Sequence, residues 1–337
     1  MATASAKRIT LAELKKRAKK GDLSEKELRA YFKTDEEHSE AFAPAIRLNY
    51  GRVDTDGEEL SPKETAELFL KATEAPKERR RRGALAARDA TGPALATRRR
   101  SVGKVLTEGD SWFNLPDFLF GYPKDAVDIL RQTHNLQNIA LWRAEIEKMV
   151  AEKQYLQPLD AGTFRHFLFS GGGNDVLGSI EKYVSPRNAG DTNPANAPNY
   201  VKPNFAAKVR SIIRLYETLS NDVRGAVGSS VTLYVHGYAN AIPVKGGEYL
   251  GKPLEAKGFN PSTVGPLATA IVAHMVGMFN TALKNFAAGR ANTVYVDMRP
   301  KVGPNDWHTD EIHPKTSGAT KIAAAFSAAI AANAPVS

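Results

Sequence analysis

The segment Gly109-Asp110-Ser111 places a hydroxyl side chain directly after a glycine that permits a tight turn. A second segment holds Asp310 and His313 three residues apart, so one turn brings a base and a carboxylate to the same side. Together these groups could activate a serine nucleophile. Each also has an ordinary alternative. Gly-Asp-Ser is a common turn composition, and His313 could cap the helix that begins near Thr316.

A third segment, Ser170-Gly171-Gly172-Gly173-Asn174, combines three glycines with an amide side chain. The glycines let the backbone approach a substrate closely, and we place Gly172 and Gly173 among the substrate-binding residues. Asn174 offers an uncharged donor to a developing oxyanion. A simple turn is the alternative. A phosphate-binding loop is disfavoured, because neither the Walker spacing nor Gly-x-Gly-x-x-Gly is present.

His308 and His313 could instead be metal ligands. A metal site would need a third ligand, and no neighbouring residue has the spacing for one. The sequence also has no cysteine, which excludes disulfides, thiol nucleophiles and cysteine-based zinc sites. We therefore favour a catalytic triad over a metal site, and expect neither a metal nor an organic cofactor.

The elements around these segments alternate between strand and helix. Apolar runs predict buried parallel strands at residues 104–107, 137–141, 166–169, 231–235 and 293–296. Helical stretches are expected at residues 124–133, 144–155, 204–219, 265–288 and 318–332. The pattern predicts a three-layer α/β/α sandwich with a five-stranded parallel sheet. The three segments then follow strands one, three and five, at the sheet edge where such folds bind ligands.

Residues 101–335 resemble the SGNH hydrolases, also called GDSL-type esterases or lipases. The resemblance rests on Gly109-Asp110-Ser111, Gly172-Gly173-Asn174-Asp175 and Asp310-Glu311-Ile312-His313, in the family's order. It implies a flavodoxin-like sheet, a Ser111–His313–Asp310 triad and a carboxylic ester hydrolase. It also implies an oxyanion hole formed by the Ser111 N–H, the Asn174 amide and a backbone N–H after the second strand.

Arg143 occupies the position at which the family has a glycine for that last donor. Arginine keeps the backbone N–H, but a turn with positive φ would strain it. The loss of one oxyanion donor would lower the rate on the order of 10²–10³-fold. The side chain could also place a cation at the pocket mouth and favour anionic substrates, whereas a solvated arginine is the plainer alternative.

The substrate is expected to be a small-molecule ester, with short-chain or acetyl esters favoured because no apolar lid-like helix is evident. A lipase, a thioesterase or a ligand-binding pseudoenzyme remain the alternatives. Trp112, Tyr238 and His308 are further candidates for substrate binding, although packing in the core is as good an explanation for the aromatic residues. His166 and His236 fall in or beside strands and are interpreted as core residues.

The first hundred residues lie outside the resemblance. We expect a helical segment over residues 1–75, a flexible linker over 76–100 and the catalytic domain over 101–337. Six of the nine net positive charges fall in residues 1–100, with basic clusters at 77–82 and 98–100. A solvated linker is the simpler reading of residues 77–100, and contact with nucleic acid or an acidic partner is the alternative.

The N-terminus shows no apolar run of the kind found in a signal peptide, and no membrane span is evident from the sequence. Together with the absence of cysteine, this predicts a cytoplasmic protein, with secretion by a route other than Sec left open.

Overall fold

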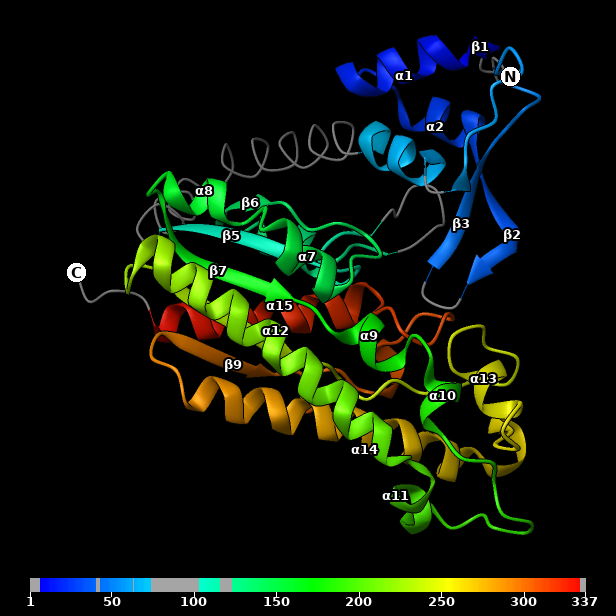
Figure 1. Ribbon diagram of the computed structural model, residues 1–337, viewed down its shortest axis with the longest axis vertical. Helices are drawn as coiled ribbons and strands as arrows, with labels where there is room; N and C mark the ends of the chain where they lie inside the picture. The colour runs from blue at the N-terminus through cyan, green and yellow to red at the C-terminus, as the bar shows by residue number, and fades with distance from the viewer. Residues whose placement is uncertain (1–6, 41–42, 63, 74–102, 116–122, 334–337) are drawn as a thin grey trace. The chain divides into compact units, whose positions relative to one another are not determined.

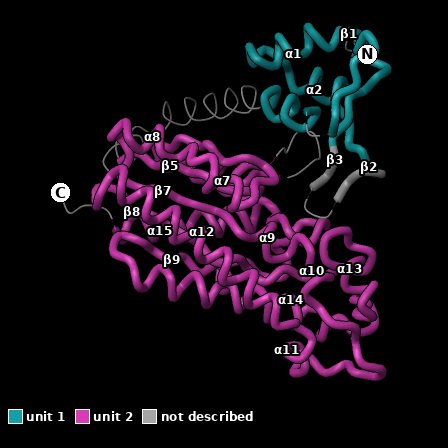
Figure 2. The backbone as a smooth tube through the Cα atoms, in the orientation of Figure 1, with its two compact units in different colours: residues 1–92, 116–122 teal, residues 93–115, 123–337 magenta. Residues whose placement is uncertain are grey.

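The computed structural model describes residues 7–40, 43–62, 64–73, 103–115 and 123–333 (Figure 1). The chain divides into two compact units, residues 1–92 with 116–122 and residues 93–115 with 123–337 (Figure 2). The predicted linker over 76–100 and its basic clusters lie outside the described residues. The domain boundaries at 75 and 100, and a partner for residues 77–100, therefore stay predictions.

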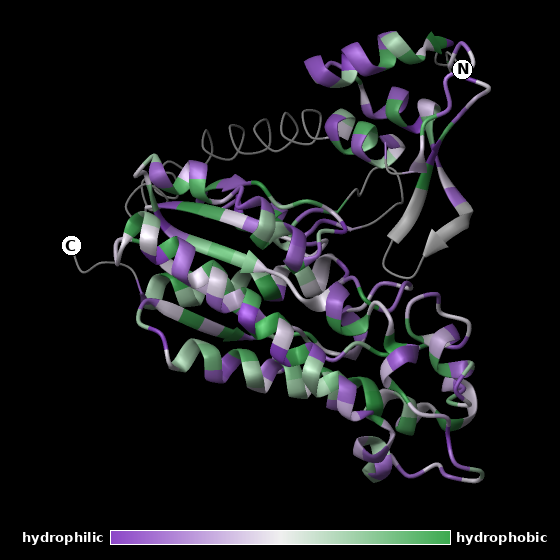
Figure 3. Ribbon diagram, in the orientation of Figure 1, coloured by the Kyte–Doolittle hydropathy of each residue, from purple (hydrophilic) through white to green (hydrophobic). Residues whose placement is uncertain are grey.

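A five-stranded parallel sheet in the order β6-β5-β7-β8-β9 forms the centre of the larger unit. Its strands are β5 (Lys104–Gly109), β6 (Asn135–Asn138), β7 (Phe164–Ser170), β8 (Thr232–Gly237) and β9 (Thr293–Asp297). Each overlaps a predicted strand, and the three inner strands β5, β7 and β8 are mostly buried, as apolar parallel strands covered on both faces should be. The central strand β7 is mostly hydrophobic in colour (Figure 3).

Helices cover both faces of this sheet. These helices are α6 (Ala126–Leu130), α7 (Ile146–Glu152), α8 (Leu156–Asp160), α12 (Pro203–Val227), α14 (Pro261–Ala288) and α15 (Thr316–Ala332). On one face Phe169 of β7 packs against Tyr216 of α12, with ring centroids 5.6 Å apart. On the other face His236 of β8 packs against Phe326 of α15, also at 5.6 Å. The predicted three-layer α/β/α sandwich is confirmed.

Shorter elements connect these layers near the carboxyl ends of the strands. They are α9 (Gly173–Leu177), α10 (Ile180–Tyr183), η1 (Pro194–Asn196), α11 (Ala197–Tyr200), α13 (Gly251–Glu255) and η2 (Pro304–Asp306). Helix α14 is the one described helix that is long and apolar enough to cross a bilayer. It packs against α12, β8 and β9, with Ile271, Met275 and Phe279 fully or almost fully buried, so its apolar composition is explained by the core.

The smaller unit contains two helices, α1 (Leu11–Lys20) and α2 (Glu25–Tyr31), and a helical stretch over residues 64–73. Thr10 caps the start of α1 and Gly21 its end, and Ser24 and Ser61 form capping boxes with Glu27 and Glu64. The prediction of a purely helical segment is wrong. An antiparallel pair, β2 (Phe32–Glu40) and β3 (Ala43–Leu48), and a short parallel pair, β1 (Ile9–Thr10) and β4 (Val53–Asp54), are also present.

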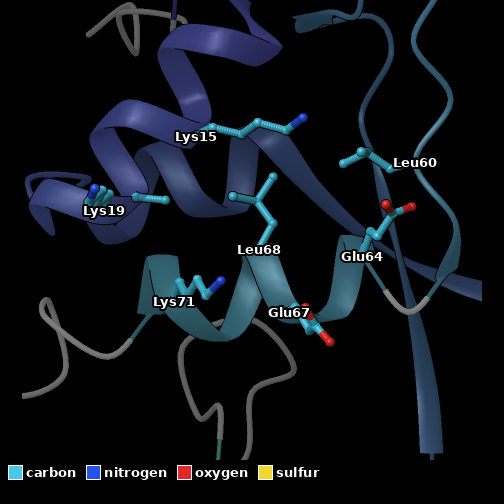
Figure 4. Close-up of a pocket in the computed structure, with 8 residues that line it drawn as sticks. Lys15, Lys19, Leu60, Glu64, Glu67, Leu68 and Lys71 are labelled. Atoms are coloured by element: carbon cyan, nitrogen blue, oxygen red, sulfur yellow. The ribbon is translucent and has the colours of Figure 1, made fainter.

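A cavity of about 740 Å³ lies between α1 and the helix over 64–73 in this smaller unit (Figure 4). Ala18, Leu60 and Leu68 supply apolar surface to it. Its charged lining mixes both signs, with Lys15, Lys19 and Lys71 beside Glu64 and Glu67. Because the charges alternate in sign, the cavity has no clear preference for an anionic or a cationic ligand.

Glu108 is an unusual residue for the core strand β5, since only 3% of it is exposed and its Oε2 has no hydrogen-bond partner among the described residues. Burial, and then the charge of Glu152, raise the pKa of Glu108 from 4.5 to about 8. The carboxyl is therefore neutral in the folded protein at pH 7. In the unfolded chain the same group ionises above its ordinary pKa.

We expect the free energy of unfolding to fall as pH rises from 4.5 to about 8, because in that window the unfolded state loses a proton that the folded state keeps. The full effect is on the order of 5 kcal/mol. Glu108→Gln should remove most of this dependence in urea unfolding measured at pH 5 and pH 8. The exposed substitution Glu147→Gln is the control, and an equal slope in both variants would contradict the assignment.

Candidate active site

The nucleophile segment follows β5 at the carboxyl edge of the sheet. The Asp110 N–H donates to the Ser170 carbonyl oxygen at 3.0 Å, so β5 and β7 remain joined to their ends. A Cβ on Gly109 would lie 2.5 Å from that carbonyl oxygen. Only glycine fits this contact, which explains why a glycine precedes Asp110-Ser111 in the sequence.

Ser111, His313 and Asp310 form a continuous chain of hydrogen bonds. His313 Nε2 lies 2.8 Å from Ser111 Oγ, and His313 Nδ1 lies 2.6 Å from Asp310 Oδ2. The serine comes from the end of β5 and the other two residues from the turn before α15. The order carboxylate, imidazole, hydroxyl is the one that serine activation needs.

The turn that carries Asp310 and His313 is held in several ways. Asp310 Oδ1 accepts the backbone N–H groups of Ile312 (3.3 Å) and His313 (3.0 Å), which brings both functional side chains to one side as the spacing predicted. A bridge between Trp307 and Pro314 closes the base of the turn. The indole N–H of Trp112 donates to the Ile312 carbonyl at 3.2 Å, which ties this turn to the nucleophile segment.

The electrostatic environment keeps Asp310 ionised. Burial alone would raise the pKa of this carboxyl, but the charge of His313 and its hydrogen bonds outweigh burial, and the pKa lies below its usual value. An ionised Asp310 fixes the proton of the neutral imidazole on Nδ1 and leaves Nε2 free to accept the serine proton.

The predicted oxyanion residues lie in two segments that bind each other. Asn174, in α9 after β7, donates its amide to the Ala144 carbonyl at 3.1 Å. Asp175 accepts the N–H of Ile146 at 3.3 Å. Arg143 has φ of +68°, so the strain expected for arginine at this position is present. Its guanidinium carbon lies 5.6 Å from the ring centroid of Trp142.

A second serine, histidine and aspartate form a buried network beside Ser111. Ser170 Oγ donates to Asp110 Oδ1 at 2.7 Å, and His236 Nε2 lies 2.8 Å from Ser170 Oγ. The Tyr238 hydroxyl donates to Asp110 Oδ2, and the backbone N–H of Trp112 donates to Asp110 Oδ1 at 3.1 Å. By composition, this Ser170–His236–Asp110 network is also a candidate triad.

The order of contacts in this second network is wrong for catalysis. The carboxylate touches the hydroxyl of Ser170 rather than the imidazole. Ser170 donates to Asp110, and His236 Nδ1 lies 3.4 Å from the Gly237 carbonyl oxygen rather than beside a carboxylate, so no acid orients this imidazole as a base. Burial lowers the pKa of His236 to about 4, so the ring is neutral, and Ser170 is completely inaccessible. We interpret the network as the support of the nucleophile turn.

The residues expected to bind substrate have different positions. Trp112 and Tyr238 are buried and pack edge to face, with ring centroids 4.8 Å apart, so core packing accounts for both. Gly172 is the N-cap of α9 with φ of +90°, and a Cβ on Gly173 would lie 2.7 Å from the Tyr238 ring. His308 is partly exposed, and its Nδ1 lies 3.5 Å from Asp310 Oδ2.

The other histidines agree with their interpretation as core residues. His166 Nδ1 lies 3.0 Å from the Tyr234 hydroxyl, and both residues are buried. Within the described part of the chain, no group of three or more His, Asp or Glu side chains is placed to hold a metal ion. The structure adds three residues that sequence reasoning missed, namely Ser170, His236 and Glu311. For Ser170 and His236, the only indication in the sequence was their position at the end of a predicted strand. Glu311 appeared only as a residue between Asp310 and His313.

No protein-family profile and no curated protein matches this sequence. Among solved structures, the chain is similar to an extracellular lipase from Streptomyces rimosus, with 13% identity and a TM-score of 0.43 over 67% of this chain and 99% of the other. It is also similar to a catalytic mutant of an acetylxylan esterase from Geobacillus stearothermophilus, with 13% identity and a TM-score of 0.41 over 68% and 94%. A phospholipase A1 from Streptomyces albidoflavus gives 16% identity and a TM-score of 0.40 over 67% and 98%.

The matched structures are those of a lipase, an acetylxylan esterase and a phospholipase. The five-stranded parallel sheet flanked by helices is the fold that the sequence resemblance predicted.

Proposed function

We propose that this protein is a serine hydrolase that cleaves carboxylic esters at Ser111. The observation that carries the proposal is the unbroken chain from Ser111 Oγ through His313 to Asp310, with contacts of 2.8 and 2.6 Å. These groups supply a nucleophile, a base and an orienting carboxylate, so the reaction can proceed without a metal or an organic cofactor.

In the proposed mechanism, Ser111 Oγ attacks the ester carbonyl carbon while its proton moves to His313 Nε2. The tetrahedral oxyanion is bound by the backbone N–H groups of Ser111 and Arg143 and by the Asn174 amide. Collapse of this intermediate releases the alcohol, which takes the proton from His313, and leaves an acyl group on Ser111. Water then attacks the acyl-enzyme with His313 as base, and the acid is released.

Hydrolysis of p-nitrophenyl esters, from acetate to palmitate, tests the activity and the acyl range in one experiment. Labelling with a fluorophosphonate, followed by peptide mass spectrometry, tests the nucleophile. We expect hydrolysis and a single label on Ser111. A protein that neither hydrolyses any ester nor accepts the label would be a ligand-binding pseudoenzyme, and the proposal would be wrong.

Short acyl chains are the favoured substrates within this proposal. An enzyme for long acyl chains needs apolar surface around its nucleophile to hold the chain. Among the described residues, Tyr50 and Val244 are the only large apolar side chains that are well exposed. We therefore propose that acetyl and other short-chain esters are hydrolysed faster than long-chain lipids.

The Arg143 position provides a test of charge selectivity. Arg143→Gly keeps the backbone N–H and relieves a positive φ, which is worth about 1 kcal/mol, but glycine adds a similar entropy to the unfolded chain. We therefore expect little change in stability and an unchanged rate on p-nitrophenyl acetate. If the cation attracts substrate, an ester carrying a carboxylate should be hydrolysed about fivefold more slowly.

The matched control for this test is Arg143→Lys, which keeps a positive charge at the same backbone position. It should retain the wild-type ratio of anionic to neutral ester. Equal ratios in wild type, Arg143→Gly and Arg143→Lys would show that the arginine side chain has no part in substrate choice.

A further inference from the structure

Glu311 lies between the acid and the base of the proposed triad, yet its side chain points to a different partner. Only 1% of this residue is exposed. Its carboxylate accepts four backbone N–H groups from the segment after β8. The donors are Val244 (2.6 Å), Leu250 (2.9 Å), Gly251 (3.0 Å) and Tyr249 (3.1 Å). We call residues 244–251 the clamp loop.

The clamp loop fits closely around this carboxylate. A Cβ on Gly247 would lie 2.1 Å from the Glu311 carboxyl carbon, and a Cβ on Gly251 would lie 1.9 Å from the Val244 carbonyl oxygen. Glu311 itself has φ of +74°, a strained conformation for a residue with a side chain. Glu311 and the clamp loop are therefore both shaped for this contact, and a side chain at either glycine would force the loop away from its present position.

The contact also explains how a buried carboxylate is tolerated. Burial raises the pKa of Glu311, and the four backbone N–H bonds act in the opposite direction. Hydrogen bonds to a charged group are stronger than neutral ones, and a buried charge without them would be strongly destabilising. Loss of the carboxylate would leave four backbone donors without their acceptor, so these hydrogen bonds stabilise the clamp loop in its observed position.

The clamp loop brings Tyr249 to the proposed base. The rings of Tyr249 and His313 meet edge to face, with centroids 6.3 Å apart and an angle of 86° between their planes. Only 6% of Tyr249 is exposed. Glu311 binds the N–H of Tyr249 and is two residues from His313, so one side chain fixes the distance between the loop and the imidazole.

We propose that Glu311 is a positioning residue: its carboxylate holds the clamp loop against His313, so that Tyr249 forms a fixed wall beside the His313 imidazole that excludes long acyl chains. The inference rests on the proposed ester hydrolysis at Ser111. It assigns specificity to a loop that lies 60 to 67 residues before Glu311 in the sequence.

Two variants of the full chain test the inference, Glu311→Gln and Tyr249→Ala. We expect the kcat/KM ratio of p-nitrophenyl acetate to p-nitrophenyl octanoate to fall about tenfold in both, through a lower KM for octanoate. Trypsin cleavage after the exposed Lys245 should accelerate about tenfold in Glu311→Gln and remain slow in Tyr249→Ala, because only the first variant releases the loop.

The matched control is Glu255→Gln, since Glu255 accepts one N–H from Gly246 at 2.9 Å and is exposed at that contact. It should keep the wild-type ester ratio.

An unchanged ester ratio in Glu311→Gln and Tyr249→Ala would contradict the role of Tyr249 in excluding long acyl chains. Unchanged trypsin cleavage in a folded Glu311→Gln would contradict the role of Glu311 in holding the clamp loop. If Glu311→Gln fails to fold by circular dichroism, Tyr249→Ala decides alone. A wild-type protein that hydrolyses no ester would instead refute the proposed function, and the trypsin comparison would still test the clamp.

Discussion

Ser111→Ala is expected to lower ester hydrolysis by a factor on the order of 10⁵, whereas Ser170→Ala should change it less than about tenfold. Both substitutions remove one hydroxyl next to an imidazole. Only Ser111 faces an imidazole whose other nitrogen contacts a carboxylate. His236 Nδ1 faces the Gly237 carbonyl oxygen at 3.4 Å rather than a carboxylate, so the second serine lacks an oriented base.

The order is reversed for stability: Ser170→Ala should lower the free energy of unfolding more than Ser111→Ala. Ser170→Ala leaves Asp110 with one donor fewer and His236 Nε2 without its hydrogen-bond partner, which costs roughly 1–3 kcal/mol. Ser111→Ala removes no support of the fold and should be close to neutral. Kinetics with p-nitrophenyl acetate and urea unfolding of both variants give the comparison. An inactive, fully folded Ser170→Ala beside an active Ser111→Ala would reverse the assignment of the two networks.

The larger unit could be predicted from the sequence because its three inner strands, β5, β7 and β8, are mostly buried. A short apolar run such as Phe167-Leu168-Phe169, placed between longer helical stretches, is typical of such a covered strand. The long helices between the strands then determine the three-layer arrangement. In the smaller unit, β2 carries Asp35, Glu36 and Glu37, residue types that are depleted in strands. Pairing with β3 overrides that local preference, and such pairing leaves no trace in a single sequence.

The site separates in the same way into local and distant parts. The Asp310–His313 turn and the positive φ of Arg143 are properties of short segments, so the spacing and the motif identify them. The partners of Asp110 come from Ser170 and Tyr238, which lie 60 and 128 residues away. The clamp around Glu311 likewise depends on residues about 60 positions earlier. Contacts of this kind exist only after the sheet has assembled, and residue types alone do not reveal them.

Asp310→Asn is expected to lower kcat by about 10⁴ while the fold is retained. Asparagine is nearly identical in shape, but its amide can donate to His313 Nδ1. The imidazole then carries its proton on Nε2, and this nitrogen donates to Ser111 Oγ instead of accepting its proton. The loss therefore arises from the wrong tautomer rather than from altered packing, and KM should change little because the substrate does not touch Asp310.

Asp297→Asn is the matched control for this prediction. Asp297 also lies at the carboxyl end of a strand, but its carboxylate pairs with Arg299 at 2.6 Å and belongs to neither network. It should keep wild-type kcat, and both variants should unfold at similar urea concentrations. If Asp310→Asn remained as active as Asp297→Asn, His313 would not need a carboxylate to set its tautomer. The reading of Ser111, His313 and Asp310 as one catalytic unit would then fail, even if Ser111 proved to be the nucleophile.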